Sequence, residues 1–108
     1  MNLNDYQELA VSTAIYPSEQ KVIYPALGLN SEAGEVADKV KKVLRDDNGV
    51  MSEERRQSLI DEVGDCLWYV AVMARDLEIS LESVAERNVA KLQSRKERGK
   101  LGGSGDKR

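Results

Sequence analysis

Two similar acidic segments, thirty residues apart, constrain this chain more than any other feature of its sequence. They are residues 32–35, with the sequence EAGE, and residues 62–65, with the sequence EVGD. In a helix, side chains at positions i and i+3 are neighbours on one surface, with Cβ atoms roughly 5–6 Å apart. Each segment therefore places two carboxylates side by side. If the two helices face each other, four carboxylates converge on one small volume, which is the candidate site.

Apolar periodicity and end signals divide the chain into four predicted helices and no strands, so the fold class is all-α. Asn4 is the predicted N-cap of the first helix, with Gln7 at the capping-box position, while Ser52 and Ser80 are the predicted caps of the third and fourth. The loop 17–25 has an apolar tip, which predicts that it packs over the helices or lines a pocket. The predicted helices cover residues 5–16, 26–46, 53–77 and 81–98.

The second and third predicted helices resemble each other. Positions thirty apart match at Leu29 and Leu59, and again at Gly34 and Gly64. We therefore expect the two helices to pair antiparallel about a pseudo-twofold axis. The third helix is apolar on nearly all sides except around its acids, which is typical of a buried helix. This pattern indicates that its two acids are not merely solvated.

The composition of the chain limits the classes of binding and catalysis that it can support. The 108 residues suit a single domain, residues 1–99, followed by a Gly-rich tail, residues 100–108, that we expect to be disordered. The net charge of -3 argues against binding to nucleic acid. Because histidine is absent, Ser-His-Asp catalysis, most zinc sites and carboxylate–histidine iron sites are excluded. Without an apolar run of membrane-spanning length or a signal peptide, the expected location is cytoplasmic and away from membranes.

The simplest interpretation of acids spaced at i and i+3 is a solvated helix surface. Against it stand the matched glycines, each costing a helix about 1 kcal/mol relative to alanine, which suggest close helix approach or room for a ligand. Two carboxylates about 5 Å apart also repel by roughly 3 kcal/mol at an effective dielectric constant of 20. A hard divalent cation such as Mg²⁺, with Mn²⁺ as a substitute, relieves that repulsion. Mg²⁺ is usually completed by substrate phosphates, so the acids predict phosphoryl transfer to water.

Basic and polar residues elsewhere fit a phosphorylated ligand. Asn88, Lys91 and Arg95 share one helix face and can contact phosphate or a sugar hydroxyl, although an ordinary polar face has the same pattern. Lys39 either pairs with Glu35 at i and i+4 or contacts phosphate. Tyr69 either stacks on a nucleoside or packs in the core.

With their flanks, the acidic segments resemble those of the MazG-type nucleoside triphosphate pyrophosphohydrolases, which carry Glu-x-x-Glu and then Glu-x-x-Asp on successive helices. The resemblance covers nearly all of residues 4–99: residues 29–38 and 61–69 carry the motifs, and residues 88–95 are similar to the family's ending. It implies an all-α bundle of four or five helices, completed as a dimer or a dimer of dimers. It also implies Mg²⁺-dependent cleavage of a nucleoside triphosphate to the monophosphate and pyrophosphate, a house-cleaning activity in nucleotide metabolism.

By match to the motif, the resemblance implies the site residues. The implied catalytic and metal-binding residues are Glu32, Glu35, Glu62 and Asp65, and the implied substrate-binding residues are Lys39, Tyr69, Asn88, Lys91 and Arg95. Some dCTP-specific relatives use a histidine and tryptophans near the amino end, whereas this chain has no histidine and only Trp68. The alternative function is a non-catalytic helical interaction module that retains the acidic motif.

Overall fold

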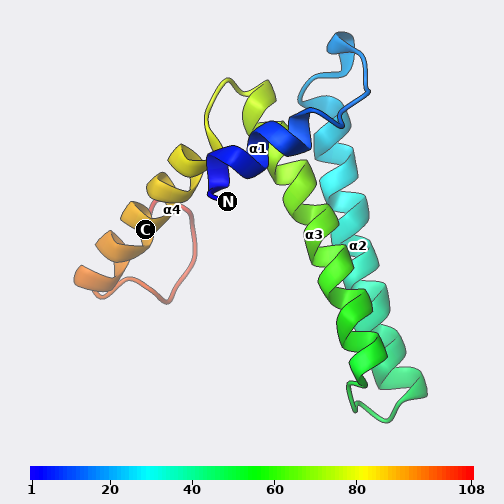
Figure 1. Ribbon diagram of the computed structural model, residues 1–108. Coiled ribbons are helices and arrows are strands. Elements are labelled where there is room, and N and C mark those ends of the chain that lie inside the picture. Colours follow the sequence, from blue (N-terminus) through cyan, green and yellow to red (C-terminus); the bar gives the residue numbers. More distant parts are fainter.

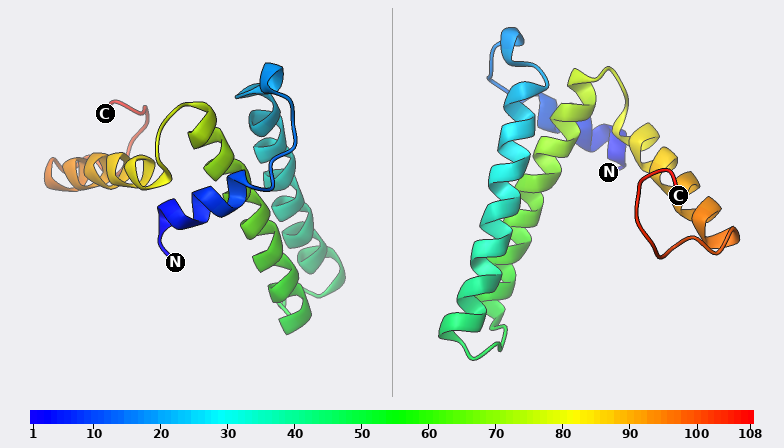
Figure 2. Two further views of the ribbon diagram at one scale, coloured as in Figure 1. Left: turned by 45° about the horizontal axis from the view of Figure 1, so that its top comes forward. Right: turned by 180° about the vertical axis from the view of Figure 1, so that it is seen from behind.

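The computed structural model describes all 108 residues and confirms the all-α fold class (Figure 1). The elements are α1 (Leu3–Val11), the short 3₁₀ turn η1 (Ser18–Gln20), α2 (Ile23–Asp46), α3 (Glu53–Asp76) and α4 (Leu81–Glu97). None of these helices combines the length and the apolar composition needed to span a bilayer. In Figures 1 and 2, α4 leads away from the other long helices, so four helices of one chain do not close into a bundle.

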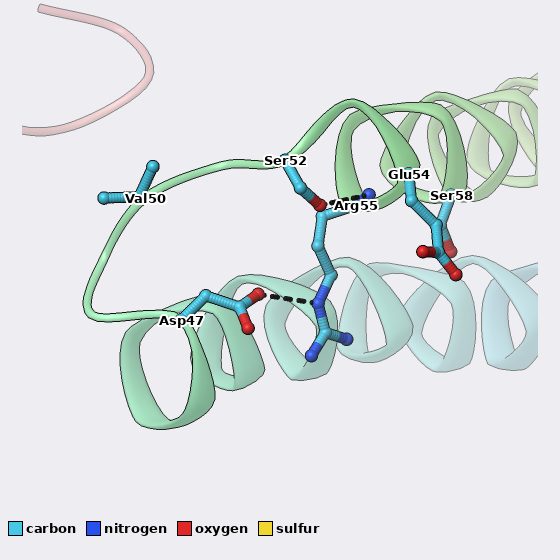
Figure 3. Close-up of a pocket in the computed structure, with 6 residues that line it drawn as sticks. All are labelled: Asp47, Val50, Ser52, Glu54, Arg55 and Ser58. Carbon is cyan, nitrogen blue, oxygen red and sulfur yellow. Dashed lines mark hydrogen bonds and ion pairs between the residues drawn. The ribbon is translucent and has the colours of Figure 1, made fainter.

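Helices α2 and α3 form an antiparallel hairpin, as the thirty-residue repeat predicts (Figures 1 and 2). Each has 24 residues. At the connecting turn, the Ser52 hydroxyl accepts a hydrogen bond from the Arg55 amide at 3.1 Å, which confirms the predicted cap. The Arg55 guanidinium then reaches back to Asp47 at 2.9 Å, from the start of α3 to the end of α2 (Figure 3). This ion pair holds the two helices in one register.

Helix α1 begins two residues earlier than predicted. Its N-cap is Asn2, which forms a capping box with Asp5, so the predicted capping role of Asn4 and Gln7 is wrong. Those two side chains instead bind the start of α4. The Gln7 carboxamide accepts from the Leu81 amide at 3.0 Å and donates to the Ile79 carbonyl at 3.1 Å. Asn4 accepts from the Glu82 amide at 3.2 Å. The two side chains to which the sequence pattern assigns the capping of α1 therefore dock α1 onto the start of α4.

The link between α1 and α2 lies against the end of α3. Val22 has φ 68° and ψ −48°, and the next amide donates to the Lys21 carbonyl at 2.7 Å. Residues 21–23 therefore form a γ-turn in which the central residue has a positive φ. This kind of γ-turn is rare and strained, and it is unusual for a β-branched residue. Asp76 holds it, because its carboxylate accepts from the Val22 amide at 2.9 Å and from the Tyr16 hydroxyl at 2.8 Å. The apolar tip itself does not pack, because Val22, Ile23 and Tyr24 are 37%, 62% and 42% exposed. The prediction that this loop packs over the helices or lines a pocket is therefore wrong for one chain, and α2 starts three residues before the predicted Ala26.

The core of a single chain is small. Only 8 of the 108 residues are buried, and the main cluster is Ala10, Ala71, Val72 and Leu81, where α1 crosses α3. The prediction that α3 is buried along its length is therefore wrong for one chain. Ile60, Val63 and Leu67 are 47%, 55% and 41% exposed. One long helix and the nine-residue α1 are too few to cover the remaining sides of α3.

We predict that Gln7→Ala lowers the free energy of unfolding by about 2 kcal/mol, because it leaves the part-buried Ile79 carbonyl and Leu81 amide without their partner. The matched control is Gln57→Ala, which removes only an exposed bond to Glu53 on the same helix and is expected to change stability by less than about 0.5 kcal/mol. Urea denaturation at one protein concentration measures both. Equal effects of the two substitutions would contradict the bridging role of Gln7.

Candidate active site

Three carboxylates meet on the hairpin. Glu32 comes from α2, and Glu62 and Asp65 come from α3. One oxygen atom from each lies within 4.8 Å of the other two. Glu32 and Glu62 are half-buried, and Asp65 faces solvent. Antiparallel pairing of two similar helices explains the convergence, because it places the two acidic segments opposite each other.

Glu35, the fourth predicted acid, lies outside this group. It is exposed, one turn further along α2. Its charge still acts on the group, because it contributes to the raised pKa of Glu32. The structure therefore brings three of the four acids together, and it leaves the fourth nearby with its side chain exposed to solvent.

The acid group is short of positive charge. Burial raises the pKa of Glu32, and the negative charge of Asp65 and contact with Glu62 raise it further. The only ion pair at the group joins Lys39 to Glu62 at 3.3 Å across the hairpin. Lys39 thus pairs with the opposite helix instead of with Glu35. One ammonium against three clustered acids leaves net negative charge.

The donor atoms fit a hard divalent cation. All three are carboxylate oxygens, the ligand type that Mg²⁺ and Mn²⁺ prefer, and no thiolate or imidazole is among them. The exposure of Asp65 leaves one side of the group open to water and to a second ligand. The residues therefore suit a hard divalent cation that keeps some ligand positions free for groups other than the protein.

A hollow of about 370 Å³ adjoins the acids. Its lining residues are Thr13, Glu32, Asp65, Trp68 and Tyr69. The Trp68 indole donates to the Thr13 hydroxyl at 2.8 Å, so the residues just after α1 close one wall. The rings of Trp68 and Tyr69 meet edge to face, with centroids 4.9 Å apart. The structure thus places the predicted Tyr69 beside the acids and adds a second aromatic wall.

Glycine shapes this hollow at a position that the sequence analysis missed. A Cβ atom at Gly28 would overlap the Tyr69 ring, so only glycine lets that ring lie against α2. By contrast, an added Cβ at Gly34 or Gly64 meets nothing within 4 Å. Close helix approach within one chain therefore does not explain the two matched glycines.

Two residues of the amino-terminal segment also lie at the site, although no sequence pattern indicated it. Burial raises the pKa of Tyr6, and the charge of Asp65 raises it further. Thr13 lines the hollow directly. Neither residue lies near an acidic motif in the sequence, so their placement depends on how α1 crosses α3.

The predicted substrate-binding residues of α4 lie away from the acids within one chain. Asn88 and Lys91 line a separate hollow of about 530 Å³ together with Asp106 of the tail. Arg95 is buried beneath that tail. Figures 1 and 2 show α4 leaving the molecule on the far side of α1 from the α2–α3 hairpin.

The chain is similar in sequence to known proteins. The family model for the MazG nucleotide pyrophosphohydrolase domain matches residues 21–99, which include all four acids and the whole of α4. The chain belongs to the MazG nucleotide pyrophosphohydrolase family. It is also similar to the Gene 37 protein of Mycobacterium phage L5, with 49% identity over an alignment of 114 residues that covers the whole of both chains. No solved structure matches it. The MazG match begins after α1, so Tyr6 and Thr13 belong to a part of the site outside the matched domain.

We predict that Glu32→Gln stabilises the metal-free protein near pH 7. Because folding raises the pKa of Glu32 above the model-peptide value of 4.5, the folded chain binds this proton more tightly than the unfolded chain. The free energy of unfolding therefore falls as the pH rises from 4.5 through the raised pKa, and Glu32→Gln removes that fall. Denaturation of both proteins in a chelating buffer between pH 4.5 and 7.5 measures how their free energies of unfolding change with pH.

The control is Glu86→Gln, at an exposed acid of α4 that makes no ion pair. It removes the same charge far from the acid group and is expected to leave the pH profile in place. A destabilising effect of Glu32→Gln at pH 7 would contradict the electrostatic account.

Proposed function

We propose that this MazG-family protein is an Mg²⁺-dependent pyrophosphohydrolase that cleaves a nucleoside or deoxynucleoside triphosphate to the monophosphate and pyrophosphate. The observation that carries the proposal is the convergence of three carboxylates from two helices, with ligand oxygens within 4.8 Å of one another. Family membership and the adjoining hollow with its aromatic walls support it. A non-catalytic interaction module would not need converging acids that repel each other.

Each acid has a proposed role. Glu32, Glu62 and Asp65 hold the cation, and Lys39 keeps Glu62 turned toward the group. When bound, Mg²⁺ or Mn²⁺ neutralises phosphate oxygens and lowers the pKa of a coordinated water. Glu35 is the proposed proton acceptor for the attacking water, because it lies next to the group without belonging to it.

The nucleoside is proposed to lie in the hollow between the acids and the two aromatic rings. Tyr69 offers a ring face for stacking on the base or ribose, in a position maintained by Gly28. Trp68 is held in place by its bond to Thr13. The triphosphate then extends from this hollow over the three carboxylates.

We further propose that the active form is a homodimer or a dimer of dimers. One chain has an accessible surface of 7717 Å², against roughly 6,000 Å² for a compact protein of 12.0 kDa. Its radius of gyration is 16.7 Å, against about 13 Å for a compact chain of this length. Covering the excess surface on each of two chains corresponds to the interface size of an obligate dimer. In such a dimer, Asn88, Lys91 and Arg95 of one subunit reach the acids of the other.

We expect Glu62→Gln and Asp65→Asn each to lower turnover by at least roughly 100-fold, beyond the loss typical of an outer-sphere partner of a metal ligand. Helix content measured by circular dichroism is expected to stay the same. The assay scores pyrophosphate and orthophosphate separately across a panel of triphosphates with Mg²⁺, which also identifies the preferred base. Asp61→Asn is the matched control, because Asp61 is an exposed neighbour outside the acid group. Full activity in either variant would refute the catalytic role, and an inactive wild type across the panel favours the interaction module.

We expect Val63→Asp to convert the dimer to monomers, because Val63 lies at the centre of the exposed apolar face formed with Ile60 and Leu67. Val50→Asp is the control, since Val50 is 69% exposed in the turn between α2 and α3. Sedimentation velocity at micromolar concentration is expected to show dimers for the wild type and the control. A monomeric wild type at that concentration would contradict the proposed assembly.

A further inference from the structure

The carboxyl-terminal tail, residues 99–108, folds back along α4 (Figures 1 and 2). The Arg108 side chain closes the tail into a loop by donating to backbone carbonyls of the tail itself. Its acceptors are Lys100 at 3.2 Å, Leu101 at 3.1 Å, Gly102 at 3.0 Å and Gly105 at 2.7 Å. Gly103 and Gly105 have φ of 92° and 88°, a conformation that glycine adopts at little cost. The tail sequence is therefore suited to this closed path.

The closed tail brings one carboxylate onto the cations of α4. Asp106 pairs with Lys91 at 2.7 Å and with Arg95 at 3.3 Å. The Arg95 guanidinium also donates to the Asp106 backbone carbonyl. Bonding to Lys91 lowers the pKa of Asp106, so this carboxylate is ionised at neutral pH. No other acid pairs with Lys91 or Arg95.

Arg95 retains unused capacity for a larger anion. It is only 6% exposed, and its Nε atom is buried without a hydrogen-bond partner. A guanidinium offers five N–H donors in a fork that matches carboxylate or phosphate. The small carboxylate of Asp106 leaves one of those donors unsatisfied, whereas a phosphate chain has several more oxygens to fill it.

We propose that the tail is an autoinhibitory latch, in which Asp106 occupies the two cations that bind the substrate's phosphates and must leave before the triphosphate enters. The inference rests on the proposed function, because it assigns phosphate binding to Lys91 and Arg95. The contact is suited to release, since the Asp106 side chain is 77% exposed and exposed ion pairs are weak. The short tether keeps the carboxylate at high local concentration, so it competes effectively with free substrate.

The test uses the chain of 108 residues with the substitution Asp106→Asn. The latch predicts that KM for the triphosphate falls about fivefold while kcat is unchanged. It predicts the same fivefold gain in affinity for inorganic tripolyphosphate, measured by calorimetry, and faster amide exchange in residues 100–108. Fivefold corresponds to about 1 kcal/mol at 1.4 kcal/mol per tenfold. Glu97→Gln is the control, because it removes one negative charge from α4 without breaking an ion pair.

The two readouts separate this inference from the proposed function. Unchanged or weaker tripolyphosphate binding by Asp106→Asn, including no binding by either protein at millimolar concentration, would overturn the latch. If the wild type cleaves triphosphates and Asp106→Asn has the same KM, the latch fails and the proposed function stands. If the wild type cleaves no nucleotide but Asp106→Asn binds tripolyphosphate more tightly, the latch stands and the proposed reaction fails.

Discussion

Unbalanced negative charge on the hairpin is the constraint on which the rest of the structure depends. Glu32, Glu62 and Asp65 can meet only if α2 and α3 pack antiparallel in one register, because a shift of one residue turns a helical side chain by about 100°. The bond from Arg55 to Asp47 at the turn maintains that register. Packing and turn chemistry therefore hold together charges that repel one another, and the repulsion makes a cation the natural ligand.

The same hairpin explains the small core. Surface on α2 and α3 that lines the acids and the hollow cannot also be covered by the chain's own helices. The apolar face at Ile60, Val63 and Leu67 also remains open, because α1 crosses only the later part of α3. In the proposed dimer, a second copy covers this face. Completion of the core and completion of the active site are then a single event, because the proposal makes both depend on assembly.

Local signals in the sequence predicted most of the fold. Ser52 and Ser80 cap α3 and α4 as their patterns indicate, and the thirty-residue repeat correctly predicts the paired helices. The predictions fail where a side chain bonds a group that is distant in the sequence but of the same chemical type as the expected local partner. Gln7 fits a capping box, yet Leu81, 74 residues away, takes its hydrogen bond. Lys39 similarly pairs with Glu62 across the hairpin, because helix pairing brings together groups that spacing along one helix cannot relate.

Under the proposed function, the two charged regions of the chain complement the two ends of one ligand. The acids of α2 and α3 lack positive charge, whereas Lys91 and Arg95 of α4 present it without an acid from any other helix. Without a ligand, a side chain of the protein itself supplies the opposite charge in each region. Lys39 pairs with Glu62 in the hairpin, and Asp106 pairs with Lys91 on α4. A complex of a divalent cation with a triphosphate supplies both charges at once. Under the proposed function, such a ligand replaces both of these internal pairings together, so its binding in the proposed dimer is linked to the opening of the tail.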